Sequence, residues 1–316
     1  MEMLYQLGKW RKESSRKVSS QKSDLGGTAA GGTIFGDIRL KNFHLQGAKD
    51  CYYWHRNDRC YQERESRKLS RPYRVAGGFA STTFSSNIVK LIGHCSEDKE
   101  RLHVYEFMQK GSLEDHLFRK NPETEAVLSW DNRLKIALGA ARALSFLHSL
   151  QTPIIHRDFK TSNISLDENY NAKLSGFELA KLGPSDGESY VETQVMGTYG
   201  YAAPEYIATG CLYVKSDVYR FGVVLLEILT GLRVIDRNRP SQKQNLVDWG
   251  KPLLSDKSNL ETFMDAKIKG QYSSKEALEM AKITRKCLVP DPKVRPSMKE
   301  VVDALEQIQA TRESSE

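Results

Sequence analysis

The pattern of apolar and polar positions changes near residue 88 and divides the chain. Residues 1–33 are polar and rich in Ser, Lys and Gly without a sustained period, which predicts a flexible leader. Residues 34–86 contain a short apolar cluster, Cys51–Trp54, but neither alternation nor a helical stripe. Two strand-like segments, 88–92 and 102–107, then flank a polar turn and predict a hairpin.

After Gly111 the apolar spacing becomes helical. One set of residues recurs at steps of three and four behind the polar start Ser129, namely Leu134, Leu138, Ala141, Leu144 and His148. This spacing predicts a helix that buries one face. Residues 217–229 are apolar on most sides and predict the central helix of the fold. Further helices are expected in 245–254, 275–287 and 297–308.

Composition places the chain among soluble globular proteins. Its 316 residues are 39% hydrophobic and 28% charged, enough for a large core. The longest apolar run, 221–229, contains Glu227 and is too short to span a membrane. The N-terminus has neither an apolar signal segment nor a Gly after Met1, so a cytoplasmic location is expected. Five scattered cysteines indicate neither a disulfide framework nor a zinc site.

The net charge of +7 is concentrated at the N-terminus. Residues 1–75 hold 16 Lys and Arg against 8 Asp and Glu, whereas the remainder holds 31 against 32. A solvated basic arm is the favoured interpretation, with weak peripheral contact to an anionic plasma-membrane surface as the alternative. Nucleic acid is not expected as a partner, because no aromatic-interleaved groove or nucleic-acid motif accompanies the charge.

The strongest motif is residues 156–163, His-Arg-Asp-Phe-Lys-Thr-Ser-Asn, which resembles the catalytic loop of protein kinases. The resemblance implies that Asp158 accepts the proton of a substrate hydroxyl, that Lys160 neutralises the transferred phosphoryl group and that Asn163 ligates magnesium. An isolated His-Arg-Asp carries little information. Here it is followed, in the family's order, by 197–205, which resembles the end of an activation segment.

Two later motifs extend the resemblance. Residues 217–222 resemble the start of the kinase central helix, whose Asp217 is implied to bind the catalytic-loop backbone. Residues 291–296 contain Arg295, which is implied to pair with Glu205 of the Ala-Pro-Glu triplet. Four motifs in order over about 140 residues identify the kinase family rather than a chance match.

Three segments are similar in sequence to plant receptor-like cytoplasmic kinases, which are serine/threonine kinases. The segments are 104–113, 182–184 and 245–249. This resemblance implies an α+β, two-lobed kinase fold that uses ATP and Mg²⁺. It also implies that Glu106 to Met108 form the adenine-binding hinge, with Tyr105 as gatekeeper. Receptor kinases or their substrates are the implied partners, in plant signalling.

These resemblances give four expected regions. They are a leader at 1–33, a degenerate β-rich N-lobe at 34–107, a mainly helical C-lobe at 108–310 and a tail at 311–316.

The chain departs from the family at the metal site. Family members carry Asp-Phe-Gly where this chain has Gly176-Phe177-Glu178. The lost Asp is the principal magnesium ligand, so its replacement by Gly predicts that efficient phosphoryl transfer fails. Glu178 is not expected to rescue the metal, because its longer side chain starts from the wrong backbone position.

The N-lobe motifs are also degenerate, and two alignments stay open. One takes 31–38 as the glycine loop, Lys49 as the nucleotide-binding lysine and Glu65 as its partner. The other takes 75–79 as the loop but has no downstream helix Glu, since no Asp or Glu occurs between Glu65 and Glu97. On either alignment an ordinary turn or linker is favoured.

Smaller departures concern single residues. Arg220 occupies a position that is small in the family, and we expect it either to strain the central helix or to extend outward to solvent. Ser165 replaces a usually apolar residue. In the activation segment, Glu192 replaces the first of two adjacent phosphorylatable residues, while Thr193 and Thr198 are candidate sites for phosphorylation by another kinase.

Three hypotheses follow. The leading one is a catalytically impaired, pseudokinase-like protein that acts by binding, as a scaffold or decoy. The second is an active serine/threonine kinase in which Lys49, Glu65 and Glu178 substitute for the missing groups. The third is the product of a decayed gene copy with a scrambled N-lobe.

Overall fold

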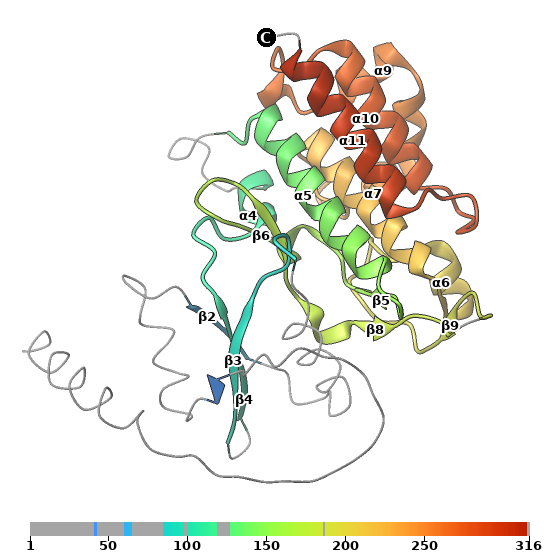
Figure 1. Ribbon diagram of the computed structural model, residues 1–316. Helices are drawn as coiled ribbons and strands as arrows, with labels where there is room; N and C mark the ends of the chain where they lie inside the picture. The colour runs from blue at the N-terminus through green and yellow to red at the C-terminus, as the bar shows by residue number, and fades with distance from the viewer. Residues whose placement is uncertain are drawn as a thin grey trace, which may run out of the picture. The chain divides into compact units, whose positions relative to one another are not determined.

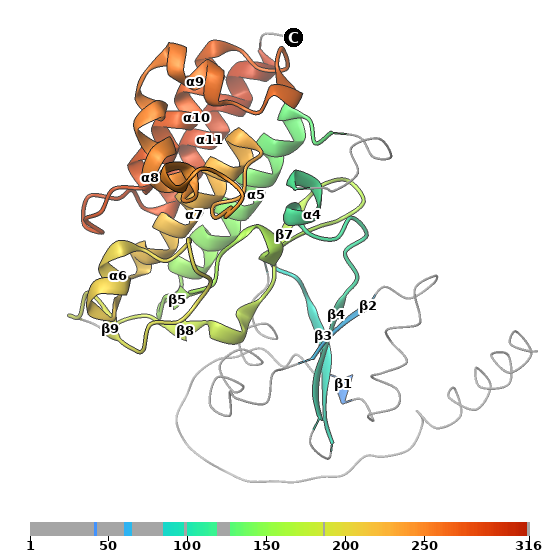
Figure 2. The ribbon, with the colours of Figure 1, turned by 180° about the vertical axis from the view of Figure 1, so that it is seen from behind.

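The computed structural model describes residues 41–42, 60–64, 85–97, 100–118, 127–185 and 187–314, with the backbone alone described at 41–42, 60–64, 93–97 and 100–103 (Figures 1 and 2). The leader 1–33, both candidate glycine loops, Lys49 and Glu65 therefore lie outside the described residues.

The larger sheet is built around the predicted hairpin. Strands β3 (Leu91–Glu97) and β4 (Glu100–Glu106) pair antiparallel, with Leu91 opposite Tyr105. Strand β2 (Cys60–Arg64) adds antiparallel to β4, and β1 (Lys41–Asn42) adds parallel to β3. The strand order is therefore β1-β3-β4-β2.

The hairpin is confirmed, but its first strand begins at Leu91 rather than at Ile88. The reason is a competing backbone partner. Ile88 forms an isolated parallel bridge with Leu174, the Val89 amide donates to the Leu174 carbonyl at 3.0 Å, and the Leu174 amide donates to the Asn87 carbonyl at 2.8 Å. Residues 87–89 thus attach the large sheet to the strand that precedes Gly176.

The first long helix, α5 (Trp130–His148), is the predicted one-faced helix. The Ser129 side chain caps it by accepting from the Asn132 amide, which satisfies one of the free donors of the first turn. Leu134, Leu138 and Leu144 are buried on its inner face, as the spacing predicts.

The central helix α7 (Val214–Thr230) is buried on nearly every side and ends at Gly231, whose left-handed φ of +65° closes the helix. Two more predicted helices follow, α10 (Ser274–Cys287) and α11 (Met298–Glu313), each opened by a serine capping box. The expected helix at 245–254 is split into α8 (Leu246–Gly250) and a 3₁₀ turn, Lys251–Ser255.

The remaining elements are short. They are the helices α4 (Leu113–Leu117), α6 (Pro204–Thr209) and α9 (Lys257–Phe263), the two-stranded sheets β5–β8 (Ile154–Ile155 with Lys181–Leu182), β6–β7 (Ile164–Leu166 with Ala172–Leu174) and β9–β10 (Val191–Glu192 with Cys211–Leu212), and 3₁₀ turns at Thr161–Asn163, Phe177–Leu179, Ser241–Lys243 and Ala266–Ile268.

One hydrophobic core joins the helices. Helix α5 packs against α7 and α11, and α7 packs against α10, as both ribbon views show (Figures 1 and 2). Trp130, Leu144, Phe221 and Leu226 are fully buried within it. Each such side chain stabilises the fold by roughly 1.5–3 kcal/mol through removal of apolar surface from water. This core holds β5–β8 and β6–β7 and so fixes the loops between them.

None of the helices in the described part of the chain combines the length and apolar character that crossing a membrane requires.

Candidate functional site

The loop at 156–163 connects β5 to β6, and a side chain of α7 binds its backbone. The fully buried Asp217 carboxylate accepts from the His156 amide at 2.7 Å and the Arg157 amide at 2.9 Å. These bonds hold Arg157 at a φ of +70°, which a residue with a side chain rarely adopts. The predicted contact between Asp217 and this backbone is confirmed.

Asp217 remains a carboxylate despite its burial. Burial by itself raises the pKa of an acid, but here the His148 hydrogen bond at 3.1 Å, nearby imidazole charge and the Arg157 amide outweigh it and hold the pKa of Asp217 below its ordinary value.

Asp158 lies at the centre of the predicted catalytic residues. Its Oδ1 accepts from the Thr198 amide at 2.9 Å and from the Thr198 hydroxyl at 2.7 Å, and its Oδ2 is 3.0 Å from Lys160 Nζ. Lys160 also donates to the Thr198 hydroxyl at 3.0 Å. Asn163 Nδ2 donates to the Asp158 carbonyl at 2.7 Å. The fold therefore brings Asp158, Lys160, Asn163 and Thr198 together.

Gly176 occupies the position where the resemblance to protein kinases implies a metal ligand. It adopts a left-handed conformation with φ of +75°, at the entry to the 3₁₀ turn Phe177–Leu179. A Cβ added there would lie 2.5 Å from Cγ, 2.6 Å from Nδ2 and 2.7 Å from Oδ1 of Asn163. The Asn163 side chain thus fills the space that a side chain at 176 would need.

The donor set around Gly176 does not fit a magnesium ion. Within the described ranges, no group of three or more His, Cys, Asp or Glu side chains could hold a metal. Asn163 directs its amide nitrogen toward Asp158, and the buried Oε1 of Glu178 has no hydrogen-bond partner. Residue 176, where a second carboxylate ligand would stand, has no side chain, so Asp158 and Asn163 are left without that ligand for an octahedral ion.

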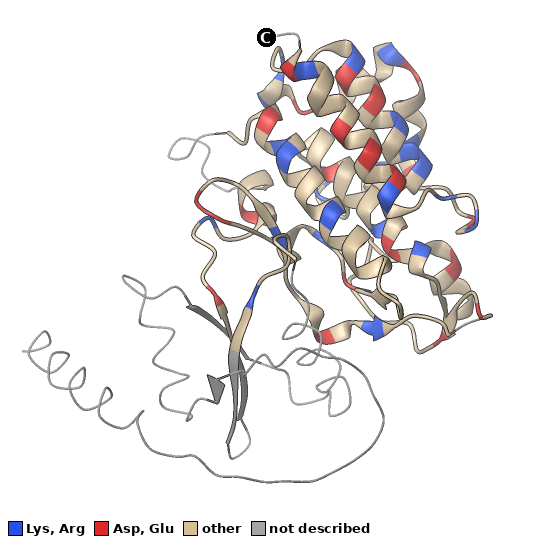
Figure 3. Cartoon of the chain, in the orientation of Figure 1, with Lys and Arg blue, Asp and Glu red and all other residues tan. Residues whose placement is uncertain are grey.

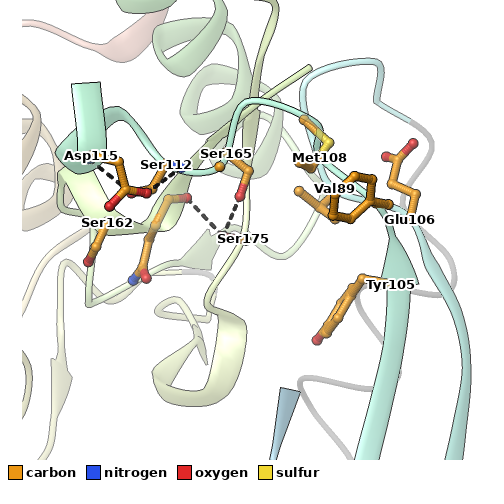
Figure 4. Close-up of a pocket in the computed structure, with 12 residues that line it drawn as sticks. Val89, Tyr105, Glu106, Met108, Ser112, Asp115, Ser162, Ser165 and Ser175 are labelled. Atoms are coloured by element: carbon orange, nitrogen blue, oxygen red, sulfur yellow. Dashed lines mark hydrogen bonds between the residues drawn. The ribbon is translucent and has the colours of Figure 1, made fainter. Parts of the chain in front are cut away.

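A cleft of about 360 Å³ opens beside these residues (Figure 4). Val89, Tyr105 and Met108 form its apolar wall and belong to one buried cluster with Leu91. The predicted hinge, Glu106 to Met108, lines the same wall. A volume in this range and an apolar wall with few polar groups are typical of small-ligand sites.

The side chain of Glu106 joins the predicted hinge to Lys90 and to Lys173 of β7. Its Oε1 accepts from the Lys90 amide at 2.9 Å and from Lys173 Nζ at 2.7 Å. The Glu106 amide also donates to the Lys90 carbonyl at 3.0 Å. These bonds keep the hinge backbone in place against β7, where Lys173 lies.

The opposite side of the cleft is polar. Ser112, Ser162, Ser165 and Ser175 line it, and Ser165 Oγ is 3.3 Å from Ser175 Oγ (Figure 4). Ser175 Oγ also donates to the Asn163 carbonyl at 3.1 Å. The sequence singled out Ser165 but not Ser175. The signal for Ser175 was its place directly before Gly176, one residue after the strand β7, which pairs with the strand of Ser165.

The activation segment is fastened at two places. Arg157 Nη2 donates to Thr193 Oγ1 at 3.1 Å, and the same guanidinium binds the Tyr206 hydroxyl through Nε at 3.0 Å. Further along, the buried Arg295 forms a bidentate ion pair with Glu205: Nη2 donates to Oε2 at 2.5 Å and Nη1 donates to Oε1 at 2.8 Å. The predicted pairing of Glu205 with Arg295 is therefore confirmed.

Arg220 corrects a sequence-based expectation. Helix α7 runs uninterrupted through it, and its side chain is fully buried rather than extended to solvent. Nε and Nη1 have no hydrogen-bond partner, and Nη2 makes one long contact, 3.4 Å from the Met196 carbonyl. The Arg220 side chain does not extend to solvent because it faces the activation segment, where Gly197 covers it. A Cβ on Gly197 would lie 2.8 Å from Nη2 of Arg220.

The sequence placed Glu227 inside the apolar run 221–229 but gave no partner for it. Glu227 in α7 accepts from the Tyr201 hydroxyl at 2.8 Å and from the Val234 amide at 2.8 Å. Tyr201 Oη lies 3.4 Å from Thr161 Oγ1 in the catalytic loop. Burial is the main reason that the pKa of Glu227 rises to about 7. A lone Glu within the apolar run 221–229 was the signal that could have revealed its burial.

Comparison with known proteins identifies relatives of this chain. A profile for the family described as protein tyrosine and serine/threonine kinase matches residues 62–305. The probable serine/threonine-protein kinase CST of Arabidopsis thaliana is 63% identical over 223 residues, which cover 71% of this chain and 52% of the relative.

Two further relatives give the same picture. The probable serine/threonine-protein kinase PBL8 of Arabidopsis thaliana is 57% identical over 225 residues, covering 71% of this chain and 54% of the relative. Receptor-like cytoplasmic kinase 176 of Oryza sativa subsp. japonica is 55% identical over 227 residues, covering 72% and 57%. The chain spans about half the length of the curated relatives it matches.

Proposed function

Given that this chain belongs to the protein tyrosine and serine/threonine kinase family, among relatives of plant receptor-like cytoplasmic kinases, we propose that it is a catalytically impaired pseudokinase. It acts in plant intracellular signalling by binding proteins, as a scaffold or as a decoy. Receptor kinases or their substrates are its proposed partners. Its proposed location is the cytoplasm, with peripheral contact to the plasma membrane through the basic N-terminus or a partner.

One observation carries this proposal. The family's metal-binding Asp is Gly176, and the Asn163 side chain occupies the adjoining space within 2.7 Å of where a Cβ would be. Phosphoryl transfer depends on positive charge held against the phosphates, and magnesium supplies most of it. With Asn163 turned to Asp158 and no acid at 176, these residues cannot hold that ion in the family's way.

The retained residues support a binding role. Asp158, Lys160 and Thr198 remain hydrogen-bonded to one another, with Asp158 and Lys160 partly exposed. A carboxylate beside an ammonium group in a partly open loop can hold a hydroxyl-bearing segment by hydrogen bonds. We propose that Asp158 and Lys160 bind and orient such a segment without transferring phosphate to it.

The cleft supports nucleotide binding more than it supports catalysis. Its hinge wall of Val89, Tyr105 and Met108 suits a flat purine ring, as ATP carries. Glu106 and Met108 are the proposed adenine contacts. Lys49, the proposed phosphate contact, lies outside the described residues.

The test is a phosphotransfer assay on the purified chain with ATP, magnesium and a general protein substrate. We expect incorporation of γ-phosphate no higher than in an Asp158→Asn variant. Metal-dependent transfer clearly above that variant would refute the proposal. Thr193 and Thr198 should still accept phosphate from an added active kinase, since the proposal treats them as targets.

An active serine/threonine kinase is the second candidate, and the assembled Asp158–Lys160–Thr198 cluster is the observation that favours it. It requires Lys49, Glu65 and Glu178 to replace the missing groups. If activity is found, it should disappear in Lys49→Met; activity that survives this change would exclude this version of the candidate, in which Lys49 replaces the missing lysine. The remaining alternative, a decayed gene copy, predicts that no endogenous peptide covering residues 40–80 is detected.

A further inference from the structure

Exposed apolar side chains gather on one stretch of the chain. Among the described residues, the exposed large hydrophobic side chains number seven, and five of these lie between residues 182 and 207. The five are Leu182, Tyr190, Val195, Tyr199 and Ile207. Apolar exposure concentrated in one region indicates an interaction surface, whereas scattered single residues do not.

Backbone contacts place part of this stretch beside α6. Strand β9 (Val191–Glu192) pairs with β10 (Cys211–Leu212), and the Thr193 amide donates to the Gly210 carbonyl at 3.1 Å. The Tyr206 hydroxyl donates to the Gln194 carbonyl at 2.7 Å and accepts from the Met196 amide at 3.0 Å. Residues 191–196 therefore lie directly beside α6, which carries Ile207.

The same stretch has a one-sided charge. From Leu182 to Val214 the sequence contains four acidic residues and no Lys or Arg. Of the acids, Glu205 is neutralised by Arg295. Glu188 and Glu192 are exposed, and neither carboxylate has a hydrogen bond or ion pair to the described residues. In Figure 3 the chain from β9 to α6 is coloured tan and red.

An aromatic pair lies beside these carboxylates. The rings of Tyr190 and Tyr213 are 5.3 Å apart, and Tyr190 shares a shallow hollow with Glu188 and Glu192. An aromatic face attracts a cationic side chain by cation–π interaction, and a carboxylate adds a charge-assisted hydrogen bond. This hollow therefore has the chemistry to bind an Arg or Lys side chain.

We infer that one face of this stretch docks a segment of a partner protein, and that this segment carries both basic and apolar residues. The face, here called the activation face, is formed by Glu188, Tyr190, Glu192, Val195 and Ile207. Arginine or lysine of that segment lies against Tyr190 between the two carboxylates, and an apolar side chain packs on Val195 and Ile207. This inference deepens the proposed binding role, and rests on it, by naming the class of partner.

Two synthetic peptides of equal length test the inference, with leucine at the same positions and either arginine or glutamate at all others. Their affinities for the full chain are measured by fluorescence anisotropy without nucleotide. The chain's net charge of +7 by itself favours the glutamate peptide. We nevertheless expect the arginine peptide to bind more tightly, with an affinity that falls as salt rises.

Variants then locate the binding. Glu188→Gln combined with Glu192→Gln should weaken the arginine peptide about tenfold, and Ile207→Ser should weaken it severalfold. The matched controls are Glu168→Gln and Val294→Ser, which alter an exposed Glu and an exposed β-branched residue elsewhere. Neither control should change the affinity. Melting temperatures check that each variant is folded.

Three outcomes would overturn the inference: equal binding of both peptides, unchanged affinity in the double Gln variant, or control variants that weaken binding as much as the activation-face variants. None of these depends on phosphoryl transfer. A positive phosphotransfer assay would instead refute the pseudokinase proposal and leave the peptide result standing.

Discussion

At the scale of single residues, two buried arginines differ in what surrounds them. Arg133 is paired with Asp265 at 2.5 Å and donates to the carbonyls of Leu128 and Ile228. Arg220 is equally buried but has two nitrogens without partners. A buried guanidinium costs free energy unless hydrogen bonds and an opposite charge compensate for its lost hydration, so the two positions should respond oppositely to an uncharged replacement.

We predict that Arg220→Met raises the free energy of unfolding by about 1–3 kcal/mol, because it removes a buried charge whose lost hydration outweighs the attraction of Asp217 and Asp158, while nearly keeping volume. Arg133→Met should lower it by about 3–5 kcal/mol, because it leaves Asp265 buried without its partner. Urea denaturation of both variants measures the two changes. A loss of stability in Arg220→Met as large as in Arg133→Met would show that Arg220 is compensated.

Gly176 permits a second prediction at this scale. In Gly176→Asp, the new side chain must displace Asn163 and break its bond to the Asp158 carbonyl, and Asp must also adopt a left-handed backbone. We expect a loss of about 1–3 kcal/mol of stability from these two effects. Restored phosphoryl transfer is not expected from this change alone.

Gly270→Asp is the matched control, because Gly270 has a similar φ of +83° with nothing within 4 Å of an added Cβ. It measures the backbone strain without the collision. Thermal melts of both variants should show the larger destabilisation at 176. If the two losses are equal, the Asn163 side chain moves away freely and the space beside Gly176 is not restricted.

At the scale of elements, Glu227 connects three of them. Its carboxylate in α7 binds Tyr201 of the activation segment, which in turn contacts Thr161 of the catalytic loop. Burial raises the pKa of Glu227 from 4.5 to about 7, so the folded protein binds a proton more tightly than the unfolded chain. The stability from this group is fully present below pH 4.5 and is lost as the pH rises to about 7.

Glu227→Gln keeps the shape and removes the titration. We expect the free energy of unfolding of the variant, relative to the unmodified chain, to increase between pH 4.5 and 7 by about 3 kcal/mol in total. Urea denaturation at several pH values measures this difference, in which the titration of all other groups cancels. Parallel stability curves for the two proteins would contradict the role assigned to Glu227.

At the scale of the whole molecule, we predict that the cleft and the metal position contribute separately to ligand binding. The apolar hinge wall with Val89, Tyr105 and Met108 suits a purine, whereas the residues around Gly176 do not fit magnesium. A ligand that binds only the folded chain must raise its melting temperature. Any stabilisation by ATP should therefore be independent of magnesium.

Thermal-shift titration of the full chain with ATP, with and without magnesium, checks this expectation. Equal shifts under the two conditions would fit a nucleotide-binding pseudokinase, and no shift in either would fit a kinase-shaped binding module. A shift that requires magnesium would contradict the metal prediction and favour the active-kinase hypothesis.

Much of the whole fold was predictable because its signals are local. The α+β kinase fold class and the relationship to plant receptor-like cytoplasmic kinases are confirmed. The helices α5, α7, α10 and α11 follow from apolar spacing and serine caps, which act within a few residues. The start of β3 was not predictable in this way, because Ile88 pairs with Leu174, 86 positions away.

The sequence by itself determined which chemical groups this protein has. Asp158, Lys160 and Asn163 are present in order, which depends only on residue types and spacing, and the resemblance to the kinase family implies a metal ligand where this chain has Gly176. Only the tertiary structure decided what surrounds each group. Arg220 is buried beneath Gly197, Asn163 fills the space beside Gly176, and Glu227 is enclosed with Tyr201. Burial and pKa depend on neighbours that are distant in sequence, and no local pattern encodes those distances.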